Sequence, residues 1–296
     1  MKRLYCSLRG GFGNQLFQWA HAFSLAQRYC AELVLDDGWY RGRRLRSETA
    51  RAFGLGCFDL PYRLPRRRER PRLALMDAAL KLQKRLNHAL LPIHFEALPL
   101  TPQRLAREPQ VVMQGCWQQH RLVVPLKSQL QQQLRFRPGS FSAAHARALA
   151  ALAEEPASVA VHVRRGDYVA DPRTAGAHGV CSLDYYAAAL AVVRQRLSDP
   201  HLFLFSDDLA WAQQQLPLQG FRVTVVDAAG QEGPALAALA EFDRMRHCRH
   251  AVIANSSFSW WAAFLLQTPE SVVIAPRHWF SWGTPKDLYA PDWLLL

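Results

Sequence analysis

The 296-residue chain lacks the features that mark a membrane-spanning, disulfide-bonded or metal-binding protein. It contains no run of about 18 apolar residues, the length that a membrane-spanning helix requires. Its six cysteines are scattered and form no Cys-x-x-Cys pair, which argues against a zinc site and against a disulfide framework. No Asp-x-Asp triplet occurs, and no His-x-x-x-His pair is present to hold a metal ion. We therefore expect chemistry that needs no metal cofactor.

Common nucleotide-binding and export signatures are missing as well. The glycine-rich residues 10–14 match neither G-x-G-x-x-G nor a Walker sequence, so nicotinamide-dependent and ATP-dependent reactions are disfavoured. The apolar stretch at the N-terminus is short and is interrupted by Arg9, unlike that of a signal peptide. We expect a cytoplasmic protein.

Acidic residues are the scarce charge type, with 24 against 36 lysines and arginines and a net charge of +12. Residues 41–72 contain eleven arginines but only Glu48, Asp59 and Glu69 as acidic residues, so eight of the twelve excess positive charges lie there. Such a block favours contact with a polyanion or with an anionic membrane surface. A solvated, irregular loop is the alternative.

The helical pattern of residues 73–91 extends this basic region. Its basic residues recur at helical spacing, at positions 81, 84, 85 and 88, and apolar residues occupy the other faces. Peripheral contact with an anionic membrane through residues 41–91 is one interpretation. A helix packed on the protein's own core is the more common one.

Strand and helix patterns alternate along most of the chain, which predicts an α/β fold with parallel sheets covered by helices on both faces. The chain break at Pro138 and Gly139, with the helix that follows it, places a domain boundary near residue 150 and gives domains 1–150 and 151–296. The predicted strands are 3–8, 32–35, 111–114, 158–163, 201–205, 222–226, 251–254 and 272–275. The predicted helices are 15–30, 73–91, 125–136, 143–154, 183–197, 208–215, 235–247 and 257–267.

The most informative segment is residues 158–168, with the sequence SVAVHVRRGDY. Its alternating valines predict a short strand that ends at Arg164 and Arg165. Ligands of α/β proteins bind at the carboxyl ends of strands, and guanidinium groups suit phosphate oxygens. The segment therefore predicts a diphosphate site, with an ordinary surface turn as the alternative.

Three other predicted strand ends carry glycine or polar residues. The glycines of residues 10–14 permit a ligand to come close, and the helix start behind them favours anions. Asp207 and Asp208 follow a hydrophobic strand, and we assign one to a helix N-cap and the other to a ribose or base. Residues 254–261 bring serines and backbone N–H groups to a helix start that suits a phosphate, with N-capping and core tryptophans as the alternative.

Together these segments resemble the α-1,2-fucosyltransferases of glycosyltransferase family 11. The H-x-R-R-G-D and A-N-S-S-F-S-W-W pieces are each fairly specific, and the matching pieces follow family order across nearly the whole chain. The block at 41–91 resembles the family least. The matching stretches are GGFGNQLFQWAHAFSLA at 10–26, QGCWQ at 114–118, VAVHVRRGDYV at 159–169, DYYAAAL at 184–190, LFLFSDD at 202–208 and HCRHAVIANSSFSWWAAFL at 247–265.

The resemblance implies a GT-B-like architecture, in which two Rossmann-like domains face each other across a cleft. It implies inverting transfer of L-fucose from GDP-L-fucose to the 2-hydroxyl of a terminal galactose, without a metal ion. The first domain would lie on the acceptor side, and the second would bind the GDP-sugar. The donor-binding residues that it implies are Asn14, Gly11, Gly13, His162, Arg164, Asp207, Asn255, Ser256, Ser257 and Phe258.

The expected mechanism is a single in-line displacement. Arg164 and Arg165 are the catalytic candidates that would stabilise negative charge on the departing diphosphate. A general base would take the proton of the acceptor hydroxyl. Asp36 is the base that we place among the catalytic residues, with Asp37 and His21 as alternatives, and the weakly basic leaving group reduces the need for a base.

The acceptor is left open by the sequence. A galactose-terminated glycan linked to a lipid, as in surface polysaccharide synthesis, suits a basic cytoplasmic enzyme that contacts the inner face of the membrane. A transferase that uses another GDP-sugar, such as GDP-mannose, is the rival among enzymes. A basic nucleic-acid-binding protein is the rival from another class, but no known binding module accompanies the arginines, so we expect no nucleic-acid partner. The intact strand ends disfavour an inactive, lectin-like relative.

Overall fold

The computed structural model describes two compact units. The first comprises Met1–Gln118 and Leu122–Arg135, and the second comprises Gln119–Arg121 and Phe136–Leu296. Each unit has its own parallel sheet, so the predicted α/β class is confirmed. The described residues are 2–43, 51–86, 93–95, 110–166, 179–234, 236–266 and 270–296.

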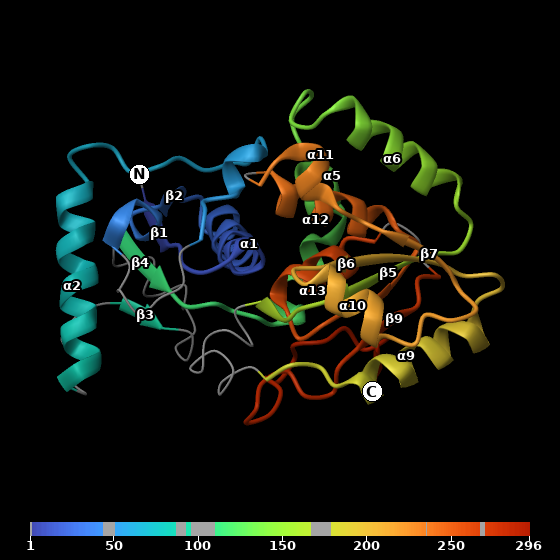
Figure 1. The fold of residues 1–296 in the computed structure, drawn as a ribbon. Helices are drawn as coiled ribbons and strands as arrows, with labels where there is room; N and C mark the ends of the chain where they lie inside the picture. Colours follow the sequence, from blue (N-terminus) through green and yellow to red (C-terminus); the bar gives the residue numbers. More distant parts are fainter. Residues whose placement is uncertain are drawn as a thin grey trace. The chain divides into compact units, whose positions relative to one another are not determined.

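The first unit is built on a four-stranded sheet in the order β2-β1-β4-β3. Helices α1 (Phe12–Arg28) and α2 (Arg70–Leu86) cover its opposite faces (Figure 1). Neighbouring residues of a strand point to opposite faces, which is why Cys6 contacts α1 whereas Tyr5 packs against α2. The strands are β1 (Arg3–Ser7), β2 (Glu32–Asp36), β3 (Ile93–Phe95) and β4 (Gln110–Gln114).

The second unit contains a six-stranded sheet in the order β10-β9-β8-β5-β6-β7. Numbered within the unit, this is the 3-2-1-4-5-6 order of the Rossmann fold, read from the opposite edge. Strand β5 lies in the middle of the sheet, and all six of its residues are buried. The strands are β5 (Ser158–Val163), β6 (His201–Ser206), β7 (Arg222–Val225), β8 (His250–Val252), β9 (Val273–Ala275) and β10 (Leu294–Leu295).

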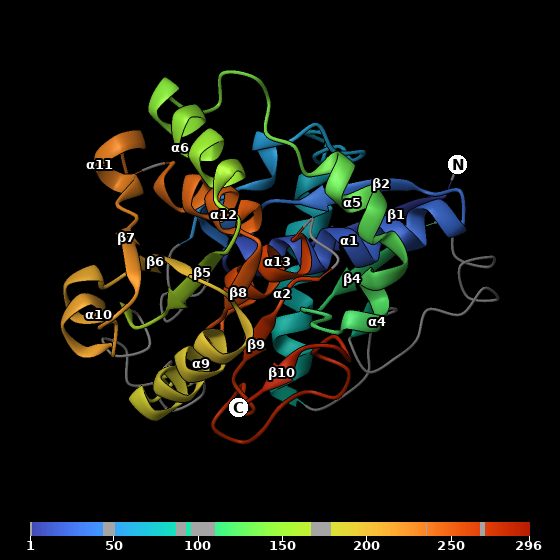
Figure 2. The same cartoon turned by 90° about the vertical axis from the view of Figure 1, so that its right-hand side faces the viewer.

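Helices cover both faces of this second sheet (Figure 2). The valines of β5 point to one face and pack with buried residues of α9 and α10, while α6 and α12 lie on the other side. The helices of the unit are α6 (Ala143–Glu154), α9 (Leu183–Arg196), α10 (Leu209–Gln215), α11 (Ala228–Glu232), α12 (Ala237–His247) and α13 (Ser257–Phe264).

Residues 136–150 group with the second unit, although the predicted boundary at residue 150 places them in the first. The reason is the packing of α6 on α12. His145 of α6 is buried, and its Nε2 lies 2.9 Å from Oδ2 of Asp243 in α12. A contact between residues so far apart in the chain leaves no trace in the local sequence pattern.

Short helical segments connect the larger elements. The predicted helix 125–136 is divided, because Pro125 lies in the 3-10 turn that precedes α5. Helix α2 begins three residues earlier than predicted, and residues 87–91 of that prediction lie outside the described residues. In the described part of the chain, no helix combines the length and hydropathy that crossing a bilayer requires. The segments are η1 (Trp39–Arg43), η2 (Leu55–Cys57), α4 (His120–Val123), η3 (Val124–Leu126) and α5 (Lys127–Gln133).

Candidate active site

Three of the predicted strand ends meet at one edge of the second sheet. Strand β5 lies between β8 and β6, and all three run in the same direction. The chain continues from β5 to β6 on one side and later adds β8 on the other, so the strand order reverses between β5 and β8. This reversal marks the place where open α/β sheets bind their ligands. The tertiary structure therefore brings the candidate residues after β5, β6 and β8 to one ligand-binding edge.

Arg164 and Asp207 form an ion pair at this edge. Nη1 of Arg164 lies 2.8 Å from Oδ2 of Asp207, and Oδ1 of the same carboxylate accepts the backbone N–H of Arg165 at 2.8 Å. The side chains of Arg164 and Asp207 are 22% and 26% exposed. The carboxylate thus orients the Arg164 guanidinium at the strand end while leaving part of it open to solvent.

Gly166 permits Asp207 to lie this close to the loop. A β-carbon at residue 166 would be 2.6 Å from Oδ2 of Asp207 and 3.1 Å from its Cγ, so the carboxylate would have to shift. The glycine of the R-R-G-D piece therefore leaves room for Asp207 in its present position. Asp167, the next residue of that piece, lies outside the described residues.

Arg165 is bound differently from Arg164. The central carbon of its guanidinium lies 3.8 Å from the centre of the Trp211 ring, and its Nε lies 3.2 Å from Oδ2 of Asp208. Asp208 also caps α10 by accepting the N–H of Trp211 at 3.2 Å. The predicted N-cap is confirmed for Asp208. Arg165 is anchored to α10, which fixes the loop that carries Arg164.

His162 is buried at the end of β5, with 4% of its surface exposed. Its ring packs 5.7 Å from the ring of Phe258, and its Nδ1 has no hydrogen-bond partner among the described residues. Burial, reinforced by the charge of Arg164, lowers the pKa of the imidazole to about 3, so the ring is neutral near pH 7. A buried, neutral ring with an unsatisfied nitrogen offers one directed hydrogen bond to a ligand.

Helix α13 begins at the same edge. Ser256 is its N-cap residue, but no side-chain hydrogen bond caps the helix within the described structure. The N–H groups of the first turn, which have no acceptor inside a helix, therefore remain suited to an anion. The predicted core position is confirmed for Trp260 and Trp261, which are fully buried, whereas Phe258 is only partly buried.

Asn255 organises the loops around this helix start. Its Nδ2 donates to the carbonyl oxygens of Gly179 and Trp279 at 3.3 and 3.2 Å, and its Oδ1 accepts from the thiol of Cys181 at 3.5 Å. The side chain is 3% exposed. Both ends of the amide are bound to protein atoms, so Asn255 ties the segments at Gly179, Cys181 and Trp279 to the loop that precedes α13.

Glu241 of α12 is a candidate that reasoning from strand ends misses. Burial and the negative charges of Asp207 and Asp227 raise the pKa of its carboxyl group to about 7, against the opposing charges of Arg244 and Arg164. A carboxyl group that senses Asp207 and Arg164 and titrates near neutrality suits proton transfer or ligand recognition. Because Glu241 lies in the middle of a helix, no turn or strand end marks it in the sequence.

The first unit has a strand-end cluster of its own. The ends of β1 and β4 lie side by side, and Asn14 in the first turn of α1 accepts a hydrogen bond from Nε2 of Gln118, after β4, at 2.7 Å. Gly10 has a φ of +80°, and a β-carbon there would lie 2.7 Å from Nδ2 of Asn14, so the position requires glycine. Gly11 is the N-cap residue of α1, and Gly13 is buried in its first turn. Gln118 is a further missed residue, and its sequence signal is the QGCWQ piece.

The three base candidates of this unit differ in their surroundings. Asp36 ends β2, is 4% exposed, and accepts the backbone N–H two residues ahead at 3.2 Å. Asp37 is paired with Arg41 at 2.8 Å. Burial lowers the pKa of His21 to about 4, and its ring lies 5.3 Å from that of Trp117. Asp37 is ion-paired and His21 is a weak base, and Asp36 stays the predicted base because of its place at the end of β2.

Known sequences resemble this chain over most of its length. The sequence profile of glycosyl transferase family 11 matches residues 113–296. The O-antigen biosynthesis glycosyltransferase WbnK of Escherichia coli is 26% identical over an alignment 315 residues long, which spans 99% of this chain and 100% of the relative. The alpha-1,2-colitosyltransferase of Escherichia coli is 26% identical over 284 residues, covering 95% and 93%. The galactoside 2-alpha-L-fucosyltransferase SEC1 of Bos taurus is 36% identical over 108 residues, or 36% of this chain and 28% of that protein.

Solved structures of fucosyltransferases share the fold. The structure of NodZ from Bradyrhizobium has a TM-score of 0.51 at 18% identity, covering 92% of this chain and 96% of that one. A complex of Arabidopsis thaliana FUT1 with GDP has a TM-score of 0.53 at 12% identity, covering 98% and 72%. At identities this low, the structural similarity establishes the fold alone. It confirms the predicted α/β fold of the GT-B class.

Proposed function

Because the chain belongs to glycosyl transferase family 11, we propose that it transfers L-fucose from GDP-L-fucose to the 2-hydroxyl of a terminal galactose, with inversion at the sugar. The Arg164–Asp207 ion pair beside the uncapped start of α13 is the observation that carries this proposal. A fixed guanidinium next to helix N–H groups is a combination that suits a diphosphate.

In this proposal the second unit binds the donor and the first lies on the acceptor side. Arg164, with the hydroxyl groups of Ser256 and Ser257 and the N–H groups of the first turn of α13, would bind the diphosphate. His162 and Phe258 would contact the guanosine, since one offers an unsatisfied ring nitrogen and the other a partly exposed ring. Asp207 and Asn255 would position these groups. The predicted donor-binding residues of the first unit are Gly11, Gly13 and Asn14.

The reaction that follows is an in-line displacement at the sugar carbon C1. The acceptor oxygen forms a bond to C1 while the bond from C1 to the β-phosphate oxygen breaks, and the electron pair leaves with GDP. Arg164 lowers the barrier by stabilising the charge on that departing oxygen. The proton of the acceptor hydroxyl passes to a base, for which Asp36 is the candidate. In the described residues, no three His, Cys, Asp or Glu side chains gather as a metal site, and the proposal routes no step through a metal.

A donor panel with a set of galactosides tests the proposal. We expect GDP-L-fucose to be the preferred donor, galactose to be modified at its 2-hydroxyl, and turnover to be unchanged by EDTA. Preference for GDP-mannose, or strong inhibition by EDTA, would contradict it. Salt-dependent retention on DNA without any binding of GDP-L-fucose would favour the nucleic-acid alternative.

A second donor deserves inclusion in the panel because a colitosyltransferase resembles this chain over almost its full length. Colitose is fucose without the 3-hydroxyl. A site that hydrogen-bonds this hydroxyl would reject the colitose donor strongly, whereas a site with an apolar wall there would discriminate only weakly. The ratio of kcat/KM for the two GDP-sugars therefore decides between them.

The acceptor that we propose is a lipid-linked glycan, with residues 41–91 at an anionic membrane surface. Part of this block, residues 44–50 and 87–91, lies outside the described residues. In the rest, Arg63 is neutralised by Glu32 and Glu69 at 2.7 Å each. The exposed side chains of Arg66 and Arg67 form no ion pair with another described residue. Co-sedimentation with liposomes that increases with their anionic lipid content is the expected result, and indifference to lipid charge would contradict it.

A further inference from the structure

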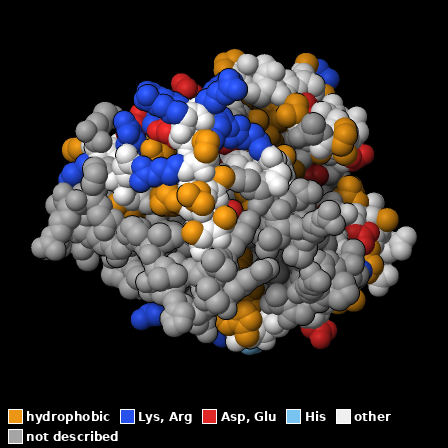
Figure 3. Space-filling view, turned by 90° about the vertical axis from the view of Figure 1, so that its left-hand side faces the viewer, with side chains coloured by type: hydrophobic (Ala, Val, Ile, Leu, Met, Phe, Trp, Pro, Cys, Tyr) orange, Lys and Arg blue, Asp and Glu red, His pale blue; other side chains and the backbone are white. Residues whose placement is uncertain are grey.

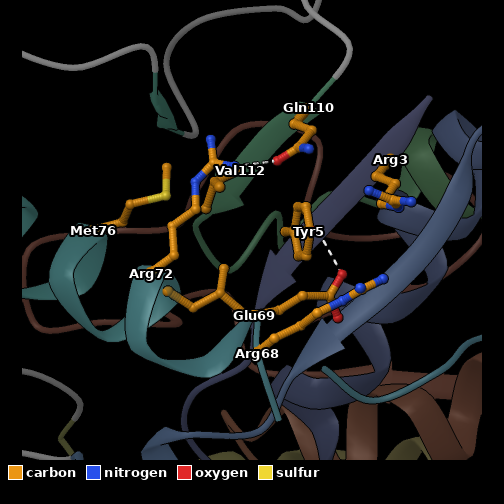
Figure 4. A pocket seen from close by; sticks show the side chains of 9 residues that line it. Arg3, Tyr5, Arg68, Glu69, Arg72, Met76, Gln110 and Val112 are labelled. Carbon is orange, nitrogen blue, oxygen red and sulfur yellow. Dashed lines mark hydrogen bonds between the residues drawn. The ribbon is translucent and has the colours of Figure 1, made fainter. Parts of the chain in front are cut away.

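A pocket of about 260 Å³ lies between the first sheet and the start of α2 (Figure 4). Arg3 and Tyr5 of β1 pair in register with Gln110 and Val112 of β4. Side chains two residues apart in a strand point to the same face, so all four line the pocket. Arg3 and Gln110 are the first residues of their strands. The pocket therefore lies toward the amino edge of the sheet, opposite the edge that carries residues 10–14.

One wall of this pocket is apolar. The ring of Tyr5 and the side chains of Val112 and Leu73 belong to one buried cluster, and Met76 packs against it. All four also line the pocket. In Figure 4 the Met76 side chain lies on the same side as Arg72, so an apolar and a cationic side chain of α2 border the space together.

The carboxylates beside the pocket are already neutralised. Glu69 accepts from Nη1 of Arg63 at 2.7 Å and from the hydroxyl of Tyr5 at 2.9 Å. Glu32 accepts from Arg63 at 2.7 Å and from Arg3 at 2.9 Å. Hydrogen bonds from Arg63 are the main cause that lowers the pKa of each carboxyl group to about 2. Two carboxylates and two guanidiniums therefore form a network that is balanced in charge.

Two further guanidiniums line the pocket without a carboxylate partner among the described residues. Arg72 donates to the neutral amide oxygen of Gln110 at 2.6 Å, and Arg68 forms neither a hydrogen bond nor an ion pair there. Figure 3 shows lysine and arginine side chains gathered on this face, with apolar side chains among them. Their combined field raises the local concentration of anions. Two guanidiniums beside an apolar wall match phosphate oxygens carried on an apolar group.

We propose that this pocket binds the phosphate or diphosphate headgroup of an amphipathic molecule. Arg68 and Arg72 hold the phosphate oxygens, and the first carbons of the chain lie against Tyr5 and Val112. The volume is below the roughly 300 Å³ at which pockets begin to hold drug-sized ligands, so a headgroup fits and an entire GDP-sugar does not. The headgroup belongs either to the lipid that carries the acceptor or to a bulk phospholipid. Only the first of these sources depends on the proposed function.

Isothermal titration calorimetry of the full-length protein with octyl phosphate tests this site. The double variant Arg68→Gln/Arg72→Gln removes both guanidiniums, and we expect its affinity to fall roughly 10- to 100-fold, the effect of losing two charge-assisted hydrogen bonds. The matched control is Arg66→Gln/Arg67→Gln, which removes the same charge from exposed positions that do not line the pocket. We expect it to change the affinity by less than about threefold, because Arg66 and Arg67 do not border the pocket and act on a bound phosphate only through screening solvent.

Two outcomes would overturn this proposal. Equal losses of affinity in both double variants would show that octyl phosphate binds through diffuse surface charge. An affinity for octyl phosphate no higher than that for inorganic phosphate would show that the apolar wall does not contribute to binding. Both variants should retain the GDP affinity and the melting temperature of the unmodified protein. These two readouts separate a failure of this site from a failure of the proposed donor site.

Vesicles then distinguish the two sources of the headgroup. Phosphatidylcholine vesicles are doped with polyprenyl phosphate or with phosphatidylglycerol at the same surface charge. Stronger binding to polyprenyl phosphate, lost in Arg68→Gln/Arg72→Gln, assigns the pocket to the acceptor carrier. Equal binding to both, lost in the same variant, assigns it to bulk phospholipid. Vesicle binding that this variant retains in full contradicts a headgroup site.

Discussion

Arg164 is the side chain on which the proposed reaction depends most directly. We expect Arg164→Ala to lower kcat/KM by about 100-fold or more, the scale of removing one group that stabilises a developing oxyanion. Arg147→Ala is the matched control, because Arg147 is exposed on α6 and belongs to none of the segments that follow the strands. Initial rates with radiolabelled donor provide the measurement. Near-normal activity of Arg164→Ala would exclude this residue from the chemical step.

Gly166 protects the geometry of that arginine. A methyl group at residue 166 would collide with Asp207 at 2.6 Å and displace the carboxylate that orients Arg164. We expect Gly166→Ala to reduce GDP affinity by roughly tenfold while the protein stays folded, since the loss corresponds to one charge-assisted contact. Gly56→Ala is the control, because a β-carbon there meets its nearest neighbour at an ordinary 3.5 Å. Unchanged GDP binding by Gly166→Ala would show that the loop yields without cost.

Glu241 predicts a pH dependence of stability. Its pKa is raised from 4.5 to about 7, so the folded protein holds this proton more tightly than the unfolded chain does. The resulting stabilisation is complete below about pH 4.5 and is lost as the pH rises through about 7. Glutamine cannot ionise, so Glu241→Gln should not lose this stabilisation as the pH rises. We expect the free energy of unfolding of the variant, relative to that of the unmodified protein, to be about 1–3 kcal/mol higher at pH 8 than at pH 5. Urea unfolding at several pH values measures this, and parallel profiles would contradict the raised pKa.

At the scale of elements, the N-terminus of α9 is capped by a side chain, whereas that of α13 is left open for a ligand in the proposed function. Ser182 caps α9 by accepting the N–H of Tyr185 at 3.1 Å, whereas Ser256 leaves the start of α13 uncapped. We expect Ser182→Ala to cost about 1 kcal/mol of stability without changing GDP affinity. Ser256→Ala should do the reverse, weakening GDP binding with little change in stability. Urea unfolding and GDP titration of both variants test the contrast. Loss of GDP affinity in Ser182→Ala, with loss of stability in Ser256→Ala, would contradict it.

At the scale of the whole molecule, the two sheets give the chain two separate cores. Donor binding at the second sheet should therefore leave a localised signature in amide hydrogen exchange. We expect GDP to slow exchange in peptides that cover residues 158–166 and 254–264, and to leave α2 of the first unit unchanged. Mass spectrometry of exchange with and without GDP measures this. Protection in α2 alone would place the nucleotide elsewhere.

The sequence predicted the parallel α/β fold because each element carries a local pattern. Alternating valines mark β5, helical periodicity marks α6 and α9, and the aspartate that follows β6 marks the cap of α10. The candidate residues of the donor site were predictable for the same reason. Each stands in the last residues of an apolar strand or shortly after one, and parallel strands bring their carboxyl ends to one edge of their sheet whatever lies between them.

The sequence by itself determined which residues follow the strands and therefore which chemical groups lie at the ligand-binding edge. Only the tertiary structure decided which of those groups contact one another and which stay available to a ligand. It paired Arg164 with Asp207, anchored Arg165 on Trp211, and enclosed the amide of Asn255 among backbone carbonyls. It also placed Glu241 near the site and opened a pocket at Arg68. These relations join residues far apart in the chain, and strand register and helix packing set them, whereas local patterns record only the neighbours of each residue.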